Sequence, residues 1–427
     1  MKKNLITAAR SPAFGLFKDR ETDWTFRRTL EFLGEKGAET GECLYAARRI
    51  DERDGDSWIF EWSDLAARVA ERGDVSLEKG HSVSARECFL RASNYYRTAE
   101  YGTSPSHPRF EPLWKASVES FRKAAALFTP PIQPVDIVFE GKQLAGYYRP
   151  AKVYGPGEPG RPTLIAAGGN DSSLEEVVLW VGMAAFRRGY NFFTFDHPGH
   201  RGALHRYPGC VKRFDYEKPY RAAIDVLETL PGVDERLAMT GYSFGGYVTC
   251  RVAAHENRLR AIAPNSPIID LLEASVAFKG NLLDLVKKLP PFLVNAMGRI
   301  ALRKMKKTPV LLAFQEYTDW TAGMLGTGLS SVERLDKGLE FLKCFTVKDD
   351  LANITMPALA MVGDGDGDAL IGQARRFIDG ISSSEKRLHL FTMERDGSDD
   401  HCQLDNRSRG AQVMFDFFDE VFTTGHL

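Results

Sequence analysis

The sequence lacks the features that mark several large classes of protein. Its six cysteines have no Cys-x-x-Cys spacing, which argues against a zinc site and a disulfide framework and fits a reducing compartment. It has no apolar run long enough to span a membrane. Neither charge is in excess, because 56 basic and 57 acidic side chains leave a net charge of -1. Nucleic acid and anionic membrane surfaces are therefore not expected partners.

These absences favour a cytoplasmic protein that acts on a small molecule. Nothing in the composition indicates a metal or a cofactor, and the composition is compatible with a monomer and with a homodimer. At 427 residues the chain exceeds a minimal catalytic domain, which predicts one large core plus an accessory region.

The chain divides into a helical part and a part in which strands and helices alternate. Within residues 85–99, apolar side chains recur at spacings of three and four, which places them along one helix face. Residues 129–134 contain three prolines and interrupt helix formation. We therefore predict a helical lobe over residues 1–130 that covers the active site, and a catalytic domain over residues 131–427 that rests on its sheet.

The second part predicts an α/β fold with a mostly parallel sheet. Short apolar segments alternate with helical ones, an order typical of parallel strands covered by helices on both faces. A mainly helical insertion, at about residues 268–350, follows the sixth strand. The predicted strands, the first two of which form a hairpin, are 135–139, 144–148, 163–167, 191–195, 237–240, 261–264, 358–362 and 388–392.

The most informative motif runs from Gly241 to Gly246 and reads Gly-Tyr-Ser-Phe-Gly-Gly, between a strand-like and a helix-like segment. Strand, Gly-x-Ser-x-Gly and helix form the nucleophile elbow of an α/β-hydrolase, in which a sharp turn exposes the serine hydroxyl above the sheet. The motif therefore predicts an α/β-hydrolase fold with Ser243 as the nucleophile. The alternative is an ordinary glycine-rich turn.

A serine hydroxyl needs a base, and the base needs a carboxylate that holds its tautomer. In this fold the acid comes after the serine, and Asp364, Asp366 and Asp368 stand together after the predicted seventh strand. We predict Asp366, because Gly-x-x-Asp lets the chain turn and leaves this carboxylate at the edge of the sheet. Asp368 is suited to cap the next helix.

His401 is the predicted base, since it lies in a polar loop after the last strand. His389 also follows the acid but alternates inside a strand, and His426 lies in the tail. A second group of histidines precedes the serine: His197, His200 and His205. This group lacks a clear carboxylate or cysteine framework, so a structural or substrate-facing role is favoured over metal binding.

The negative oxygen of a tetrahedral intermediate needs backbone N–H donors. One is expected from Phe244, directly after the nucleophile, and the other from the loop after the strand at 163–167. In that loop Asn170 is the predicted donor and Gly169 the next candidate. A plain strand-to-helix turn is the alternative.

The chain resembles one branch of the α/β-hydrolases. This branch contains dihydroxypseudooxynicotine hydrolase, the fungal polyketide-shortening hydrolases of melanin synthesis and the fermentation-respiration switch esterases. Besides the elbow, the runs that carry the resemblance are GGNDSSLEE at 168–176, FDHPGHRG at 195–202 and HCQ at 401–403. His197 stands where relatives usually have glycine, and His200 where they often have glutamine.

The resemblance implies a helical cap over the active site and Ser-Asp-His chemistry. For some relatives it also implies cleavage of a carbon–carbon bond next to a ketone. A carboxylate of the Glu175-Glu176 pair is then a candidate substrate contact, with Glu176 preferred and His197 as a second candidate. Placement of acidic residues in the first turn of a helix is the alternative explanation for the glutamate pair.

The leading hypothesis is a serine hydrolase, without a cofactor, that cleaves a β-diketone or aryl ketone of polyketide type. A carboxylesterase or thioesterase needs the same three residues and a better leaving group, so it stays as an alternative. A binding protein that keeps the hydrolase fold without turnover is the alternative from another class.

Overall fold

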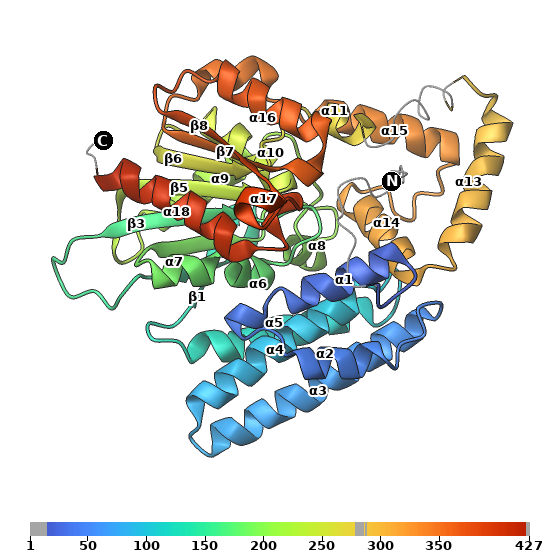
Figure 1. The fold of residues 1–427 in the computed structure, drawn as a ribbon, viewed down its shortest axis with the longest axis horizontal. Coiled ribbons are helices and arrows are strands. Elements are labelled where there is room, and N and C mark those ends of the chain that lie inside the picture. The colour runs from blue at the N-terminus through green and yellow to red at the C-terminus, as the bar shows by residue number, and fades with distance from the viewer. Residues whose placement is uncertain (1–14, 278–285, 287, 424–427) are drawn as a thin grey trace.

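The computed structural model describes residues 15–277, 286 and 288–423, and its centre is one eight-stranded sheet (Figure 1). The strand order is β1-β2-β4-β3-β5-β6-β7-β8. β2 runs antiparallel to β1 and β4, and the later neighbours are parallel. The strands are β1 (Gln133–Phe139), β2 (Lys142–Arg149), β3 (Arg161–Ala167), β4 (Asn191–Phe195), β5 (Val233–Tyr242), β6 (Leu259–Asn265), β7 (Ala358–Gly363) and β8 (Lys386–Phe391).

Burial on both faces explains why the inner strands form. Every residue of β4 and of β7 is buried, as expected for strands that helices cover on both sides. Successive side chains point to opposite faces, so that Leu164 belongs to one apolar cluster and Ile165 to another. The predicted α/β-hydrolase fold is confirmed, and each predicted strand corresponds to a strand of the sheet.

The register of the parallel strands aligns their carboxyl ends. Ala167 at the end of β3 pairs with Gly241 of β5, and Tyr242 pairs with Asn265 at the end of β6. The loops that follow these strands therefore leave from the same edge of the sheet, which is where open α/β sheets bind ligands.

In the described part of the chain, five α-helices precede the sheet and lie together beside it (Figure 1). α3 packs on α4, and α4 packs on α5. The predicted helical N-terminal region is thus present, and the periodic segment 85–99 lies inside α4. The helices are α1 (Arg20–Leu30), α2 (Thr40–Ala47), α3 (Gly55–Glu78), α4 (Ser82–Tyr101) and α5 (Phe110–Ala126).

These helices share an apolar core with one face of the sheet. Phe26 of α1, Trp62 of α3 and Phe121 of α5 belong to the same cluster of buried side chains as Leu164 of β3 and Phe415 near the C-terminus. The helices of the sheet region are α6 (Leu174–Val177), α7 (Met183–Arg187), α8 (Arg201–Arg206), α9 (Glu217–Leu227), α10 (Phe244–Ala253), α16 (Asp368–Gly380), α17 (Met393–Asp396) and α18 (Arg407–Thr423).

The predicted helical insertion lies between β6 and β7. Its helix α14 contacts α1 and α4, so the insertion and the N-terminal helices meet (Figure 1). Across the described ranges, no helix combines the length and apolarity needed to cross a membrane. The helices of the insertion are α11 (Leu271–Ala277), α13 (Pro291–Met305), α14 (Pro309–Thr321) and α15 (Ser331–Lys343).

Candidate active site

Ser243 occupies a sharp turn between β5 and α10. Its backbone has φ 57° and ψ -117°, a conformation that side-chain-bearing residues rarely adopt. A side chain at Gly241 would collide with the carbonyl of Gly245, and one at Gly245 would lie 2.5 Å from the carbonyl oxygen of Ala167. The two glycines of the motif therefore permit the close packing of strand and helix that exposes Ser243.

Asp366 and His401 form a hydrogen-bonded pair at the same edge of the sheet. Asp366 ends a 3-10 turn after β7, and its Oδ1 lies 2.5 Å from His401 Nδ1. Its Oδ2 accepts hydrogen bonds from Ser266 Oγ at 2.9 Å and from the Gly363 N–H at 3.1 Å. The Asp366 carboxylate is thus buried and each of its oxygens has a hydrogen-bond partner, whereas Asp364 and Asp368 are exposed.

Three hydrogen bonds bring the loops of this site together. The backbone carbonyl of Asn265 accepts hydrogen bonds from the Ser243 N–H at 2.7 Å and from Cys402 Sγ at 3.3 Å, which joins the serine turn to the loop that holds His401. The Gly365 N–H donates to the carbonyl of Asp399 at 2.8 Å, which joins the Asp366 turn to the same loop.

The environment of His401 favours its protonated form. Burial opposes protonation, but the Cys402 sulfur and the Asp366 carboxylate outweigh it and raise the pKa of His401 well above its ordinary value. His401 is the one of the three candidate histidines that the described residues place on Asp366. His389 belongs to β8 and contacts Asp396 at 3.1 Å, and His426 lies outside the described residues.

The loop after β3 lies against Ser243, the predicted nucleophile. A side chain at Gly169 would lie 3.4 Å from Ser243 Cβ and 3.1 Å from the carbonyl oxygen of Tyr242. Asn170, the predicted second oxyanion donor, follows directly, and Phe244, the predicted first donor, begins α10. Asn170 and Ser243 both keep part of their surface exposed.

A short polar chain supports this loop from behind. His200 Nδ1 lies 2.6 Å from Asp196 Oδ1, and His200 Nε2 lies 3.1 Å from Ser172 Oγ. The Ser172 hydroxyl also donates to the carbonyl of Gly169 at 3.2 Å. Asp196, His200 and Ser172 are all buried. Their arrangement gives His200 two protein partners and a structural role next to the predicted oxyanion loop.

His197 and His205, the other two histidines that precede the serine, have different contacts from His200. His197 is buried, its Nδ1 lies 3.1 Å from the carbonyl oxygen of Pro198, and burial with the nearby His200 lowers its pKa to about 3, so the ring is neutral. His205 stacks on Trp114 at a centroid distance of 4.3 Å. The predicted substrate contact of His197 stays a prediction.

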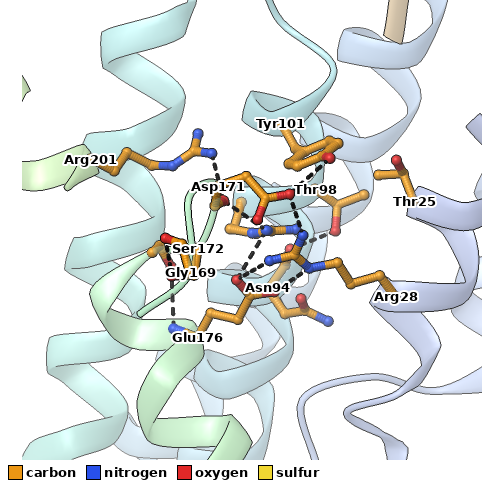
Figure 2. A network of polar contacts seen from close by, with 12 residues as sticks. Thr25, Arg28, Asn94, Thr98, Tyr101, Gly169, Asp171, Ser172, Glu176 and Arg201 are labelled. Atoms are coloured by element: carbon orange, nitrogen blue, oxygen red, sulfur yellow. Dashed lines mark hydrogen bonds and ion pairs between the residues drawn. The ribbon is translucent and has the colours of Figure 1, made fainter. Parts of the chain in front are cut away.

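Glu176 is held by two arginines of the N-terminal helices (Figure 2). Its Oε1 accepts from Arg28 Nε at 2.8 Å, and its Oε2 accepts from Arg28 Nη2 at 2.7 Å and from Arg97 Nη2 at 3.0 Å. Arg28 Nη1 also bonds Asp171 Oδ2 at 2.8 Å. The Glu176 carboxylate therefore has charged protein partners, and its contact with a substrate stays a prediction.

Glu175 faces a different environment. Its Oε1 accepts a hydrogen bond from the Tyr147 hydroxyl at 3.1 Å, and burial raises the pKa of Glu175 to about 7. The two neighbouring glutamates are thus buried on different partners, Glu175 on a phenol and Glu176 on guanidinium groups.

Sequence alone does not single out three cations near the site: Arg27, Arg28 and Lys212. Arg27 contacts Asp400, the residue before His401, and Lys212 contacts the Asn170 side chain. Arginine and lysine are common on exposed helix faces and loops, so only their position in space distinguishes them.

Comparison with known proteins gives a consistent picture. Residues 38–327 match the sequence model of the FrsA-like esterases. Hydrolase acrC of Aspergillus aculeatus is 34% identical over 269 residues, which cover 58% of this chain and 62% of that protein. The 20-hydroxy-prefusarin hydrolase FUS2 of Gibberella moniliformis is 32% identical over 263 residues, which cover 59% of this chain and 61% of that protein. The matches thus span less than two thirds of these relatives.

A solved structure shows the same fold. The 2,6-dihydroxy-pseudo-oxynicotine hydrolase superposes with a TM-score of 0.70 over 92% of this chain and 96% of that chain, at 22% sequence identity. The likeness therefore includes the N-terminal helices as well as the sheet.

Proposed function

This chain belongs to the FrsA-like esterase family, and we propose that it is a serine hydrolase that cleaves a carbon–carbon bond next to a ketone through Ser243, His401 and Asp366. The observation that carries the proposal is the 2.5 Å contact of His401 with a buried Asp366, on a loop tied through the Asn265 carbonyl to the strained turn at Ser243. This combination supplies a nucleophile, a base and an orienting acid.

The chemistry follows from these roles. His401 takes the Ser243 proton as the hydroxyl attacks the carbonyl, and Asp366 holds the imidazole and stabilises its protonated form. The N–H groups of Phe244 and Asn170 bind the oxygen that becomes negative. The tetrahedral intermediate then expels the leaving group, which His401 protonates, and water releases the acyl group from Ser243.

A relative and the chemistry of the leaving group support the proposed substrate class. The relative FUS2 is named for hydrolysis of 20-hydroxy-prefusarin, which supports an organic small molecule as the substrate. For a carbon leaving group, the bond must break to a carbanion that an adjacent carbonyl or phenol ring stabilises. A β-diketone or aryl ketone of polyketide type meets this requirement. Carboxylester or thioester hydrolysis is the second candidate, favoured by the esterase family match.

A fluorophosphonate probe tests the nucleophile. We expect it to label the protein at Ser243, because an activated serine attacks phosphorus, and we expect Ser243→Ala to abolish labelling. Peptide mass spectrometry identifies the labelled serine, and Ser382→Ala, at an exposed serine, is the matched control. Ser243→Ala and His401→Ala should each lower kcat by about 10⁴-fold or more.

The same proteins separate the candidate functions. Turnover is measured with benzoylacetone, p-nitrophenyl butyrate and an acyl thioester. Absence of labelling and of all turnover in well-folded wild-type protein would support a binding protein. Turnover of esters or thioesters alone would support the second candidate.

A further inference from the structure

Lys212 lies in the loop between α8 and α9 and reaches the candidate active site. Its Nζ donates hydrogen bonds to Asn170 Oδ1 and, at 3.0 Å, to Thr321 Oγ1 at the end of α14. Its backbone N–H donates to the Thr321 carbonyl at 3.0 Å, which fixes the base of the side chain as well as its tip. The α8–α9 loop, the predicted oxyanion loop and the helical insertion thus meet at the Lys212 ammonium group.

The Lys212 ammonium lies next to Phe244 and Asn170, the two predicted oxyanion donors. Its Nζ is 5.0 Å from the centre of the Phe244 ring, and Phe244 directly follows Ser243. Its partner Asn170 directly follows Gly169, at which a Cβ would lie 3.4 Å from Ser243 Cβ. Lys212 is also partly exposed, as Asn170 and Ser243 are. The ammonium group therefore lies beside the loop and the helix start that flank Ser243.

The charge of Lys212 has no matching carboxylate. Both of its side-chain acceptors are neutral, and among the described residues no carboxylate lies within ion-pair distance of its Nζ. Asp171, whose charge acts to raise the pKa of Lys212, is itself bound by Arg28 at 2.8 Å. Burial lowers the pKa of Lys212 to about 7, so the surroundings disfavour the charge that these contacts leave unpaired.

We propose that Lys212 is a substrate-binding residue whose ammonium contacts an anionic oxygen of the carbon leaving group. This inference rests on the proposed function of Ser243 and adds a residue that distinguishes carbon–carbon cleavage from ester cleavage. The substrate accordingly carries an enol or phenol oxygen close to the scissile carbonyl.

Carbon–carbon cleavage passes through an acyl ester of Ser243. Ser243 Oγ forms a bond to the ketone carbon, and the negative oxygen that results re-forms the carbonyl as the carbon–carbon bond breaks. The electron pair of that bond passes to the leaving carbon and onto the adjacent carbonyl oxygen, which gives an enolate. Lys212 donates a hydrogen bond to this oxygen, and protonated His401 delivers its proton to the carbon. Water then cleaves the acyl–serine ester to a carboxylic acid and free Ser243.

The kinetic test compares Lys212→Gln and Lys212→Met with the wild type on benzoylacetone and p-nitrophenyl butyrate. Glutamine can still donate a hydrogen bond to Asn170 but carries no charge. We expect both variants to lower kcat/KM for the diketone by about 10²-fold, which is the size of effect seen when one anion-stabilising donor is lost. For the ester we expect kcat/KM to fall by no more than about tenfold. Lys218→Met, at an exposed lysine of α9, is the control.

Three kinetic results would overturn the inference. Equal losses on both substrates would mean that Lys212 acts on the nucleophile or on the fold. Wild-type behaviour of Lys212→Gln would mean that a hydrogen bond to Asn170, and not charge, is what matters. Unchanged diketone turnover in both variants would exclude the contact.

A binding measurement is independent of turnover. In the Ser243→Ala background, bound benzoylacetone should show the long-wavelength absorption of its enolate near neutral pH, because an ammonium partner favours the anion. Addition of Lys212→Gln should remove that band. Its absence in Ser243→Ala, or its persistence without Lys212, would overturn the role of Lys212. Ester turnover that survives Ser243→Ala would count instead against the proposed nucleophile.

Discussion

Ser243 is held in a costly backbone conformation by its neighbours. A residue other than glycine at positive φ costs about 1–2 kcal/mol, and Ser243 has φ 57°. The Ser243 N–H donates to the Asn265 carbonyl at 2.7 Å, and the Gly246 N–H donates to the Ser243 carbonyl at 2.8 Å. These bonds offset the cost and fix the direction in which the hydroxyl leaves the turn.

Asp366 is expected to set both the rate and its pH dependence. His401 must be neutral to accept a proton, so activity falls as the pH drops through its pKa, and the raised pKa places this fall above that of an ordinary histidine. Asp366→Asn removes the carboxylate that helps to raise the pKa. We expect kcat to fall by about 10⁴-fold and the acidic limb of the kcat/KM profile to move to lower pH.

Asp364→Asn is the matched control, because Asp364 is an exposed carboxylate two residues away. It should leave the rate and the profile close to those of the wild type. A greater loss in Asp364→Asn than in Asp366→Asn, or an unmoved acidic limb in Asp366→Asn, would remove Asp366 from the role of the acid.

The helix α1 connects the N-terminal region to both loops of the candidate site. Arg27 contacts Asp400, the residue before His401. Arg28 bonds Asp171, in the predicted oxyanion loop, and Glu176, which follows that loop (Figure 2). Two loops of the candidate site therefore take part of their support from α1 as well as from the sheet.

Arg28→Met tests this support. The change leaves the buried Glu176 carboxylate and the partly buried Asp171 carboxylate with fewer partners, and breaking a buried ion pair costs about 3–5 kcal/mol. We expect the free energy of unfolding in urea to fall by about that amount and kcat/KM for p-nitrophenyl butyrate to fall as well. Adding Glu176→Gln should restore part of the stability, since it removes a buried charge that has lost one of its two arginine partners.

Arg48→Met, at an exposed arginine that follows α2, is the control for loss of a surface cation. It should change the free energy of unfolding by no more than about 0.5 kcal/mol. Stability of Arg28→Met within the same range would show that the network in Figure 2 contributes little.

At the scale of the whole molecule, the N-terminal helices and the sheet share one apolar cluster. It contains buried side chains from α1, α3, α4 and α5 together with others from β3, β4 and α18. Helices that only docked onto a separately folded sheet domain would bury less apolar surface against that domain. The continuity predicts that the helices and the sheet lose their structure together.

Equilibrium unfolding in urea checks this continuity. Four of the six tryptophans lie in the N-terminal helices, so tryptophan fluorescence reports mainly on them, whereas far-UV circular dichroism reports on the whole chain. We expect the two signals to follow one coincident transition. Two separated transitions would show that the helices form an independent unit. The tryptophans in question are Trp24, Trp58, Trp62 and Trp114.

Much of the fold could be predicted because it depends on local pattern. Apolar segments of strand length indicate the inner strands, and spacings of three and four indicate a helix such as α4. The prediction of Asp366 over Asp364 also rested on local geometry, since a glycine turn places the third following residue at the edge of the sheet. The domain division near residue 130 and the roles of the candidate site residues stay predictions.

The partners of the buried charges could not be predicted in this way. Glu176 and Arg28 stand 148 residues apart, and no spacing relates them. Lys212 and Asn170 likewise come from separate loops that only the packed sheet brings together. The sequence by itself determined the strands, the helices and the turn at Ser243, because periodicity and glycine act over a few residues. Only the tertiary structure decided which charges meet, because the strength of an ion pair or hydrogen bond depends on distance in space and on burial, and neither is a property of a short segment.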